Sequence, residues 1–183
     1  IVSHFGLLNH MRNPKYFWRA LNDLCAENNS FSERLELHLG GTLDAGVLVE
    51  LNRLEHLKPC LHVHSYISHE EVLKWYSKSS LLLLLTFESE IGKGNIPGKL
   101  FEYLAMNKPV IAFGHEDGDV AKILEQTEVG WNFEYQAGNE GSIKKTILGS
   151  FNSLQNPNQN HEFEKFNRES LTKRLVNLLD NIS

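Results

Sequence analysis

The sequence contains few cysteines, no long apolar run and no strong excess of charge of either sign. Its two cysteines, Cys25 and Cys60, are too few for a disulfide framework, which indicates a reducing compartment. The longest apolar run, Leu81–Leu85, is far too short to span a bilayer. The net charge of −5 is spread along the chain, so neither nucleic acid nor an anionic membrane surface is expected as the main partner. Any anionic ligand must therefore be held by a local group of residues.

The composition is that of an ordinary globular protein. The 183 residues, of which 41% are apolar, are enough to bury a core within one large domain. No signal peptide is visible, and a strand-like segment starts at once from Ile1 rather than from a methionine. We therefore expect a fragment of a longer protein.

Short β-like runs alternate with amphipathic segments along most of the chain. This alternation predicts an α/β fold, with a mostly parallel, Rossmann-like sheet covered by helices on both faces. The run Leu81–Leu85 does not alternate, as expected of a central strand buried on both faces. The predicted strands are Ile1–Phe5, Leu35–Leu39, Leu61–Tyr66, Leu81–Thr86, Pro109–Phe113 and Gly130–Phe133.

Helices are predicted from capping residues and apolar periodicity. The first opens near Asn13-Pro14, and Ser68 with Glu71 forms a capping box for another. Asp117, or a residue near it, is expected to cap a later helix. A polar stretch, Gly149–Gln159, predicts a connector before a last helix whose apolar stripe must pack on something. The other predicted helices are Asp44–Leu57, His69–Lys78, Leu100–Met106 and Phe163–Ile182.

The loop that follows the leucine-rich strand has the most unusual composition. Between Glu88 and Lys99 it contains Gly92, Gly94 and Gly98, which let backbone amides approach a ligand closely. Lysine in the first turn of a helix opposes the helix dipole, so a bound phosphate would stabilise Lys99 there. The alternative is a solvated lysine paired with Glu102. The spacing matches neither a Walker A loop nor a dinucleotide fingerprint.

The segment IPGKLFEYLAMNKPVIAFG, with the preceding HEEVLKWYSKS and LLLLL, resembles the donor-binding signature of GT-B glycosyltransferases of the "glycosyl transferases group 1" class. The stretch HFGLLNHMRNPKYFWRAL is similar to the first strand, loop and helix of that family's C-terminal domain. The resemblance covers the chain from Ile1 to about Ile147. It implies the C-terminal half of a GT-B fold.

The resemblance also implies roles for individual residues. Gly6, Arg12 and Lys99 would lie on the diphosphate of the donor, with the glycine-rich turn at Gly98 supplying backbone amides. Glu102 would accept hydrogen bonds from the ribose hydroxyls, and the loop around Ile67 would contact the base. No metal and no cofactor is implied, because the cations take the place of a metal.

The implied function is transfer of a sugar, with retention, from a nucleoside diphosphate sugar to a saccharide or lipid-linked acceptor. Residues 1–150 would form the nucleotide-sugar-binding domain. Residues 151–183 would form a connector and a helix that packs on this domain or on a missing N-terminal domain. That missing domain would hold the acceptor, so the fragment alone would be inactive. The expected location is cytoplasmic, with membrane association through the missing half as a further possibility.

Two features depart from the family pattern, and two other functions stay open. Gly94 replaces a first glutamate, for which Glu88 or Glu90 could substitute, and Leu7 stands where an arginine is common. These departures concern sugar recognition. One alternative function is a nucleotide-sugar epimerase of the GT-B type, and the other is a non-catalytic mononucleotide-binding module.

Several histidines could in principle carry chemistry. Cys60, His62 and His64 alternate along a predicted strand, as zinc ligands could, but no fourth ligand is evident. We interpret them as the polar face of an edge strand. His4 and His69 are expected near the donor loops as hydrogen-bonded loop histidines. His10 is expected there too, within possible reach of a phosphate.

Overall fold

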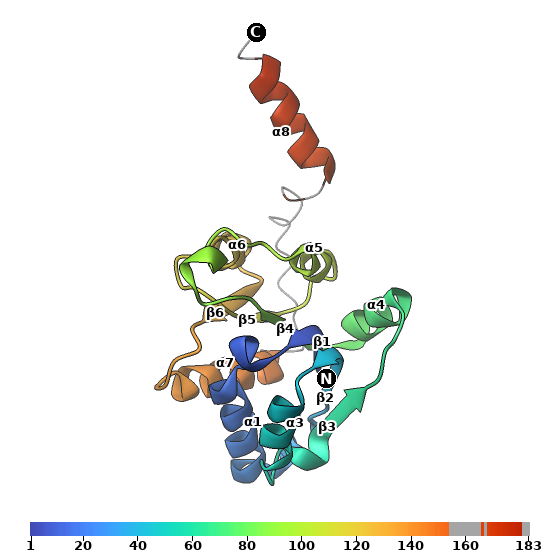
Figure 1. Ribbon diagram of the computed structural model, residues 1–183, viewed down its shortest axis with the longest axis vertical. Helices are drawn as coiled ribbons and strands as arrows, with labels where there is room; N and C mark the ends of the chain where they lie inside the picture. The colour runs from blue at the N-terminus through green and yellow to red at the C-terminus, as the bar shows by residue number, and fades with distance from the viewer. Residues whose placement is uncertain (154–165, 167, 181–183) are drawn as a thin grey trace.

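The computed structural model describes residues 1–153, 166 and 168–180. Within them, six parallel strands form one sheet in the order β3-β2-β1-β4-β5-β6 (Figure 1). Each strand overlaps its predicted segment, and the α/β class with a parallel sheet is confirmed. The strands are β1 (Val2–Leu8), β2 (Leu37–Leu43), β3 (Leu61–His64), β4 (Leu81–Leu85), β5 (Val110–Phe113) and β6 (Gly130–Phe133).

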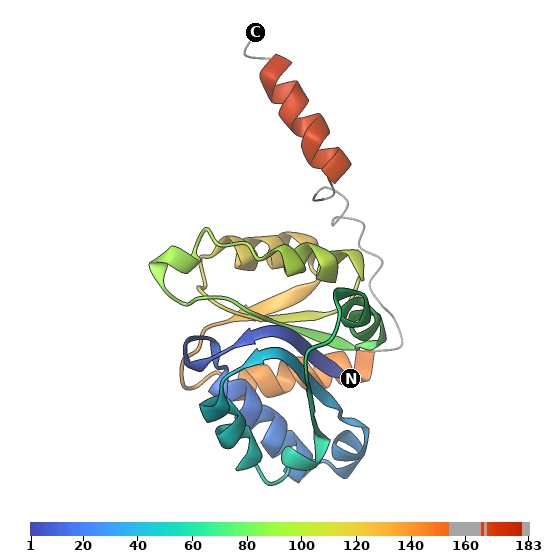
Figure 2. The ribbon, with the colours of Figure 1, turned by 45° about the vertical axis from the view of Figure 1, so that its right-hand side comes forward.

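Helices cover both faces of the sheet, as predicted. One face carries α1 (Lys15–Glu27), α3 (Ala45–Asn52) and α7 (Glu140–Ser153), and the other carries α4 (His69–Lys78), α5 (Gly98–Ala105) and α6 (Asp119–Thr127) (Figure 2). Each face has its own apolar core. The leucines of β4 alternate between the two cores, which confirms a central strand buried on both sides.

The bounds of β2 differ from the prediction at both ends. Leu35 is not in the strand, because it ends a short helix, α2 (Asn29–Arg34), that the sequence analysis missed. At the other end β2 continues to Leu43, since its last residues pair in register with Phe5–Leu8 of β1. Both β1 and β2 extend beyond their predicted carboxyl ends, so the loops that follow them start from the same edge of the sheet.

Helix starts confirm some capping predictions and correct others. The capping box of Ser68 and Glu71 opens α4 as expected. The cap expected at or near Asp117 is the next residue, because Gly118 is the N-cap of α6, and no side chain caps this helix. The N-cap of α1 is Pro14, while the side chain of Asn13 accepts a hydrogen bond from Trp18 Nε1.

Helix ends also differ from the predictions. α3 ends at Asn52, five residues before the predicted end at Leu57. α5 runs over Gly98–Ala105 instead of Leu100–Met106. α7 continues to Ser153, so the start of the expected connector is helical, and Phe151 packs there with its ring centroid 5.2 Å from that of Phe31.

The last described element is α8 (Arg168–Asp180), which lies away from the sheet (Figures 1 and 2). The remaining residues of the predicted connector and of the predicted helix Phe163–Ile182 lie outside the described residues, apart from Phe166. The apolar side chains of α8 are exposed, namely Leu171, Leu175, Val176, Leu178 and Leu179. Among the described helices, none has the length and apolar character needed to cross a membrane.

Candidate functional site

The direction in which strands are added to the sheet reverses at β1. Strands β2 and β3 lie on one side of β1, and β4, β5 and β6 lie on its other side. In open parallel sheets the ligand crevice lies at such a reversal, beyond the carboxyl ends of the strands. Two loops meet there. One follows β1 and contains a short 3-10 helix, His10–Arg12, and the other follows β4 and leads through a second one, Glu90–Gly92, into α5.

Lys99 reaches from the first turn of α5 to the end of β1. Its Nζ donates a hydrogen bond to the carbonyl oxygen of Phe5 at 2.8 Å. Burial lowers the pKa of Lys99, repulsion from the nearby guanidinium of Arg12 lowers it further, and Glu102 partly offsets both. In the described part of the chain no carboxylate forms an ion pair with Lys99. The alternative of a solvated Lys99–Glu102 pair is therefore not what the structure shows.

Gly6 lies directly against this lysine. A Cβ atom at Gly6 would collide with Lys99 Nζ and would come within 3.5 Å of His4 Nε2. On the neighbouring strand Gly41 has a φ of +98°, and a Cβ there would lie 2.6 Å from the Gly6 carbonyl oxygen. Gly41 therefore requires glycine, whereas a side chain at Gly6 would displace the lysine from its place beside the end of β1.

Arg12 lies over the loop that follows β4. Its guanidinium carbon is 3.9 Å from the centroid of the Phe87 ring. The Nε atom of Arg12 is buried and has no hydrogen-bond partner among the described residues. The backbone around it is fixed by Asn9, whose side chain accepts hydrogen bonds from the amides of Met11 and Arg12. Two cations, Arg12 and Lys99, thus converge on the crevice from different elements.

Glu102 lies one turn further along α5 and is partly exposed. Its Oε1 is 3.5 Å from Nε2 of His69, the first residue of α4. Ile67, just before that helix, is half-buried against the core of this face. The structure therefore places Glu102 beside the start of α4, close to the loop that contains Ile67.

The three glycines of the loop have different surroundings. A Cβ at Gly92 would collide with the Phe87 carbonyl, so this glycine serves close packing of the loop on itself. Nothing lies within 4 Å of a Cβ built at Gly94 or Gly98. Only these two leave open space, and Gly98 is the first residue of α5, where helix amides lack partners within the helix.

The acidic residues of the loop after β4 are partly engaged. Glu90 lies 3.0 Å from Lys93 Nζ and 3.5 Å from Nε2 of His115, which follows β5. These charges lower the pKa of Glu90, with Lys93 as the largest cause. The Tyr135 hydroxyl donates to the Thr86 carbonyl oxygen at 2.8 Å, which ties the same loop to the chain after β6.

His4 was expected both within the strand Ile1–Phe5 and among the loop histidines near the donor, and only the first expectation is confirmed. It is a buried strand residue of β1, not a loop histidine, and its Nδ1 donates to the Leu83 carbonyl oxygen at 2.9 Å. Its Nε2 is buried beside Gly6 and has no partner among the described residues. Burial, with repulsion from Lys99, lowers the pKa of His4 to about 3. The predicted strand Ile1–Phe5 contains His4, so its place in a strand could be expected from the sequence, whereas its burial could not, because β1 shows no polar/apolar alternation. His10 lies exposed in the β1 loop.

The expected histidine strand is the edge strand β3, as predicted, but Cys60 is separate from it. Cys60 precedes β3 and packs in the core on the α1 face, whereas His64 lies near Phe5 and Trp75 of the other face. The Cys60 Sγ donates to the Ser32 carbonyl oxygen at 3.6 Å. Cys25 is adjacent, and burial raises the pKa of the Cys25 thiol to about 12. Both thiols are buried in the core.

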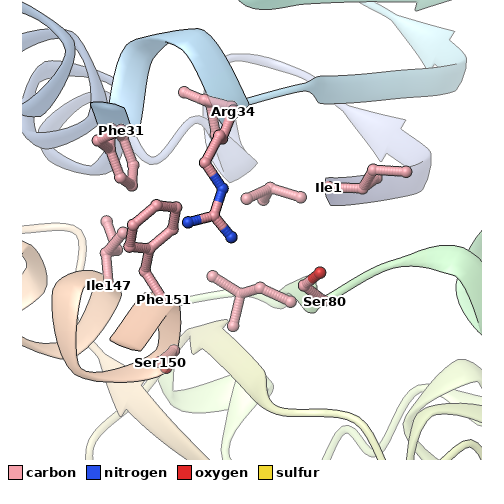
Figure 3. Close-up of a pocket in the computed structure, with 10 residues that line it drawn as sticks. Ile1, Phe31, Arg34, Ser80, Ile147, Ser150 and Phe151 are labelled. Atoms are coloured by element: carbon pink, nitrogen blue, oxygen red, sulfur yellow. The ribbon is translucent and has the colours of Figure 1, made fainter. Parts of the chain in front are cut away.

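A small cavity lies at the opposite ends of the strands from the crevice. It has a volume of about 90 Å³ and lies between the start of β1 and the ends of α2 and α7 (Figure 3). Arg34 points across it, with its guanidinium carbon 4.5 Å from the centroid of the Phe151 ring. Ligand pockets typically enclose about 300 to 1,000 Å³, so this cavity is too small for a sugar nucleotide.

Comparisons with known proteins agree with the fold. No curated protein is significantly similar to this chain in sequence. Solved structures with a similar fold include a glycosyltransferase from Rickettsia africae (14% identity, TM-score 0.69, covering 99% of this chain and 47% of that one). A sucrose-phosphate synthase from Thermosynechococcus elongatus is similar too (16%, 0.68, 99% and 45%). So is Anabaena HepE in complex with UDP (15%, 0.68, 98% and 48%).

The chain spans about a third to a half of the length of these and other solved chains that it matches, between 34% and 48%. At such low identities the structures show a shared fold, which is a Rossmann-like part of GT-B glycosyltransferases. The family evidence comes from the sequence pattern described as "Glycosyl transferases group 1", which matches residues 1–149. The chain therefore belongs to the group 1 glycosyl transferases, as its motifs predicted.

Proposed function

We propose that this chain is the donor-binding half of a GT-B glycosyltransferase and holds a nucleoside diphosphate sugar in the crevice beyond β1 and β4. The observation that carries the proposal is the meeting of Lys99 and Arg12 beside Gly6 at the start of α5. Two cations that repel each other there, next to helix amides that favour negative charge, would be stabilised by an anion. The UDP complex of the similar Anabaena protein supports a diphosphate as that anion.

The cations would act on the leaving group of the reaction. When the sugar leaves, negative charge develops on the diphosphate, and Arg12, Lys99 and the amide of Gly98 would stabilise it there. This is electrostatic catalysis and needs neither a metal nor a cofactor from this half. The sugar would pass to a saccharide or lipid-linked acceptor with retention of anomeric configuration.

The nucleoside would lie along α5 toward the start of α4. Glu102, oriented by His69, would accept hydrogen bonds from both ribose hydroxyls, because an ionised carboxylate is an acceptor only. The backbone around Ile67 would contact the base. On the sugar side, Gly94 faces open space where the family pattern implies a glutamate, and Glu90, held by Lys93 and His115, is the candidate substitute.

The acceptor site would belong to an N-terminal half outside the 183 residues. The coverage of solved structures, between a third and a half, leaves room for such a half. The exposed apolar stripe of α8 would pack against it. This half alone would then bind the donor without turnover, in a reducing compartment, as part of an enzyme of saccharide synthesis.

Calorimetry with UDP, GDP, ADP and their sugars tests the proposal. We expect one of these to bind at a single site, and we expect Lys99→Ala to weaken binding about tenfold to a hundredfold, since charge-assisted hydrogen bonds contribute about 1.5–3 kcal/mol. Lys74→Ala on α4 removes the same charge from an exposed Lys74–Glu70 pair and serves as the matched control. Absence of nucleotide binding, or equal affinity for the Lys99→Ala and wild-type chains, would contradict the proposal.

Calorimetry together with an activity assay separates the alternatives. A non-catalytic module without a phosphate-binding site would bind none of the nucleoside diphosphates. An epimerase would bind them, but the full-length enzyme would convert the sugar nucleotide without any acceptor. Sugar transfer that requires an acceptor identifies the transferase.

A further inference from the structure

A second group of polar side chains lies at the edge of the sheet where β2 and β3 begin. Glu36 precedes β2, and His38 in β2 is the register partner of His62 in β3. One ligand atom from each of these three side chains lies within 4.8 Å of the others. A carboxylate and two imidazoles are thus brought together from two strands that are more than twenty residues apart in sequence.

His38 is the fixed member of this group. Its Nε2 is 3.0 Å from Glu36 Oε2, and its Nδ1 is 2.8 Å from Nε2 of His64. The Trp75 ring of α4 packs on it, with centroids 4.2 Å apart, and only 5% of His38 is exposed. Glu36 and His62 are exposed, so their side chains are free to turn toward a ligand held by His38.

We propose that Glu36, His38 and His62 form a Zn²⁺ site on this edge. Imidazole nitrogen and carboxylate oxygen are ligands that zinc prefers, and two histidines with one glutamate leave a fourth position for water. Zinc-bound nitrogen and oxygen lie about 2.0–2.2 Å from the ion, so ligand atoms on a tetrahedral ion are about 3.4 Å apart. The His62 ring now stacks on the His38 ring, with centroids 4.6 Å apart, so it would have to turn toward the ion. Rotation of the exposed His62 and Glu36 side chains would then close the spread of 4.8 Å to the separation of ligand atoms on a tetrahedral ion.

His64 would position the zinc ligand and not bind the ion itself. When Nε2 of His38 binds the metal, Nδ1 carries the proton, and the 2.8 Å contact to His64 Nε2 becomes a hydrogen bond with His38 as donor. Such a bond to the remote nitrogen fixes the tautomer and the ring orientation of a metal-binding histidine. The pair of histidines is therefore arranged as a ligand and its support.

The zinc site would be independent of the nucleotide crevice. Glu36, His38 and His62 lie where β2 and β3 begin, whereas the crevice lies at the carboxyl ends of the strands. A metal bound to both strands would tie the four-residue edge strand β3 to its neighbour. The proposal does not rest on the proposed function, and either can fail without the other.

Calorimetric titration of the chelator-treated chain with ZnCl₂ tests the site. We expect one Zn²⁺ per chain, with no binding of Mg²⁺, which prefers oxygen ligands. His62→Gln and Glu36→Gln should each weaken zinc binding at least tenfold. His56→Gln, which removes an exposed histidine elsewhere, and Cys60→Ala, which removes a thiol beside Cys25, should leave it unchanged. Zinc should raise the melting temperature of the wild-type chain but not of the His62→Gln chain.

The supporting role of His64 has a separate readout. His64→Ala should weaken zinc binding about tenfold to a hundredfold, as loss of such a partner typically does, whereas His64→Gln keeps an acceptor and should retain most of the affinity. Absence of one-to-one zinc binding, or equal zinc affinity in the wild-type and His62→Gln chains, would overturn the proposal. UDP titrations of the His62→Gln chain should match the wild type.

Discussion

The molecule gathers polar side chains at two ends of the same sheet, and the two groups differ in charge and in support. The crevice beyond β1 and β4 brings together Lys99 and Arg12 on loops and a helix start, with no carboxylate paired to either among the described residues. The edge at the start of β2 and β3 brings together imidazoles and a carboxylate on strands. The first arrangement favours an anion and the second a transition-metal cation such as Zn²⁺. One sheet therefore offers opposite chemistry at its two ends.

The largest effect should come from acid, through the imidazole of the crevice. The pKa of His4 is about 3 in the folded chain against 6.5 when unfolded, so below pH 6.5 only the unfolded state binds the proton. Stability is then lost as the pH falls from 6.5 toward 3, by about 2 kcal/mol between pH 7 and pH 5.

The variant His4→Asn checks this expectation. Asparagine keeps a donor for the Leu83 carbonyl oxygen and does not titrate. Denaturant unfolding at several pH values should show a flatter acid limb for His4→Asn than for the wild type. Parallel curves for the two chains would mean that His4 is not held neutral by its burial.

The next effect concerns the carboxylate of the crevice. Glu102→Ala should lower the affinity for a nucleoside diphosphate by about 1.5–3 kcal/mol, since it removes charged acceptors of ribose hydroxyls. Titration with the 2′-deoxy form separates this role from general destabilisation. The wild type should prefer the ribose form, and Glu102→Ala should bind both forms equally. A preference that survives the substitution would exclude Glu102 from the ribose.

A matched pair of glycine substitutions sharpens the picture of how the crevice is built. Gly6→Ala should destabilise the fold by about 1–3 kcal/mol, because the new Cβ displaces Lys99 Nζ and breaks its charge-assisted hydrogen bond to the Phe5 carbonyl oxygen. Gly98→Ala adds the same methyl group into open space and should change the unfolding free energy by less than about 1 kcal/mol. Chemical denaturation measures both. Equal losses would show that the lysine moves aside without cost.

The smallest effect is expected at the exposed rim of the crevice. His69 is mostly exposed, and its pair with Glu102 is long at 3.5 Å. His69→Ala should therefore change stability by no more than about 1 kcal/mol, as exposed pairs do. Thermal unfolding at neutral pH, with the His56→Ala chain as control, checks this. A larger loss would place His69 in the packing of α4.

The crevice could be predicted from the sequence because the topology of the sheet determines which loops lie together. Parallel strands bring the loops that follow them to one edge, so Gly6, Arg12 and Lys99 meet without any distance being known. The environment of His4 could not be predicted in this way. His4 is held neutral by its burial together with the charges of Lys99 and Arg12. These residues are far from His4 in sequence or on another element, so a local sequence pattern cannot indicate their effect.

The edge cluster shows where sequence reasoning stops. His62 and His64 were visible as an alternating pair, but Cys60 was grouped with them by its two-residue spacing, although it lies one residue before the predicted strand Leu61–Tyr66 and before β3. Glu36 and His38 could join them only once β2 and β3 were known to be neighbours in register. Likewise α2 was missed, since six residues with one buried side chain carry little periodicity.

The bond from Lys99 to the Phe5 carbonyl also bears on how tightly a ligand could be bound. Fixing a lysine side chain costs about 1.5–2 kcal/mol of conformational entropy. Here the ammonium group is already held in place in the folded chain by a backbone hydrogen bond. Binding of an anion therefore does not have to immobilise the lysine side chain.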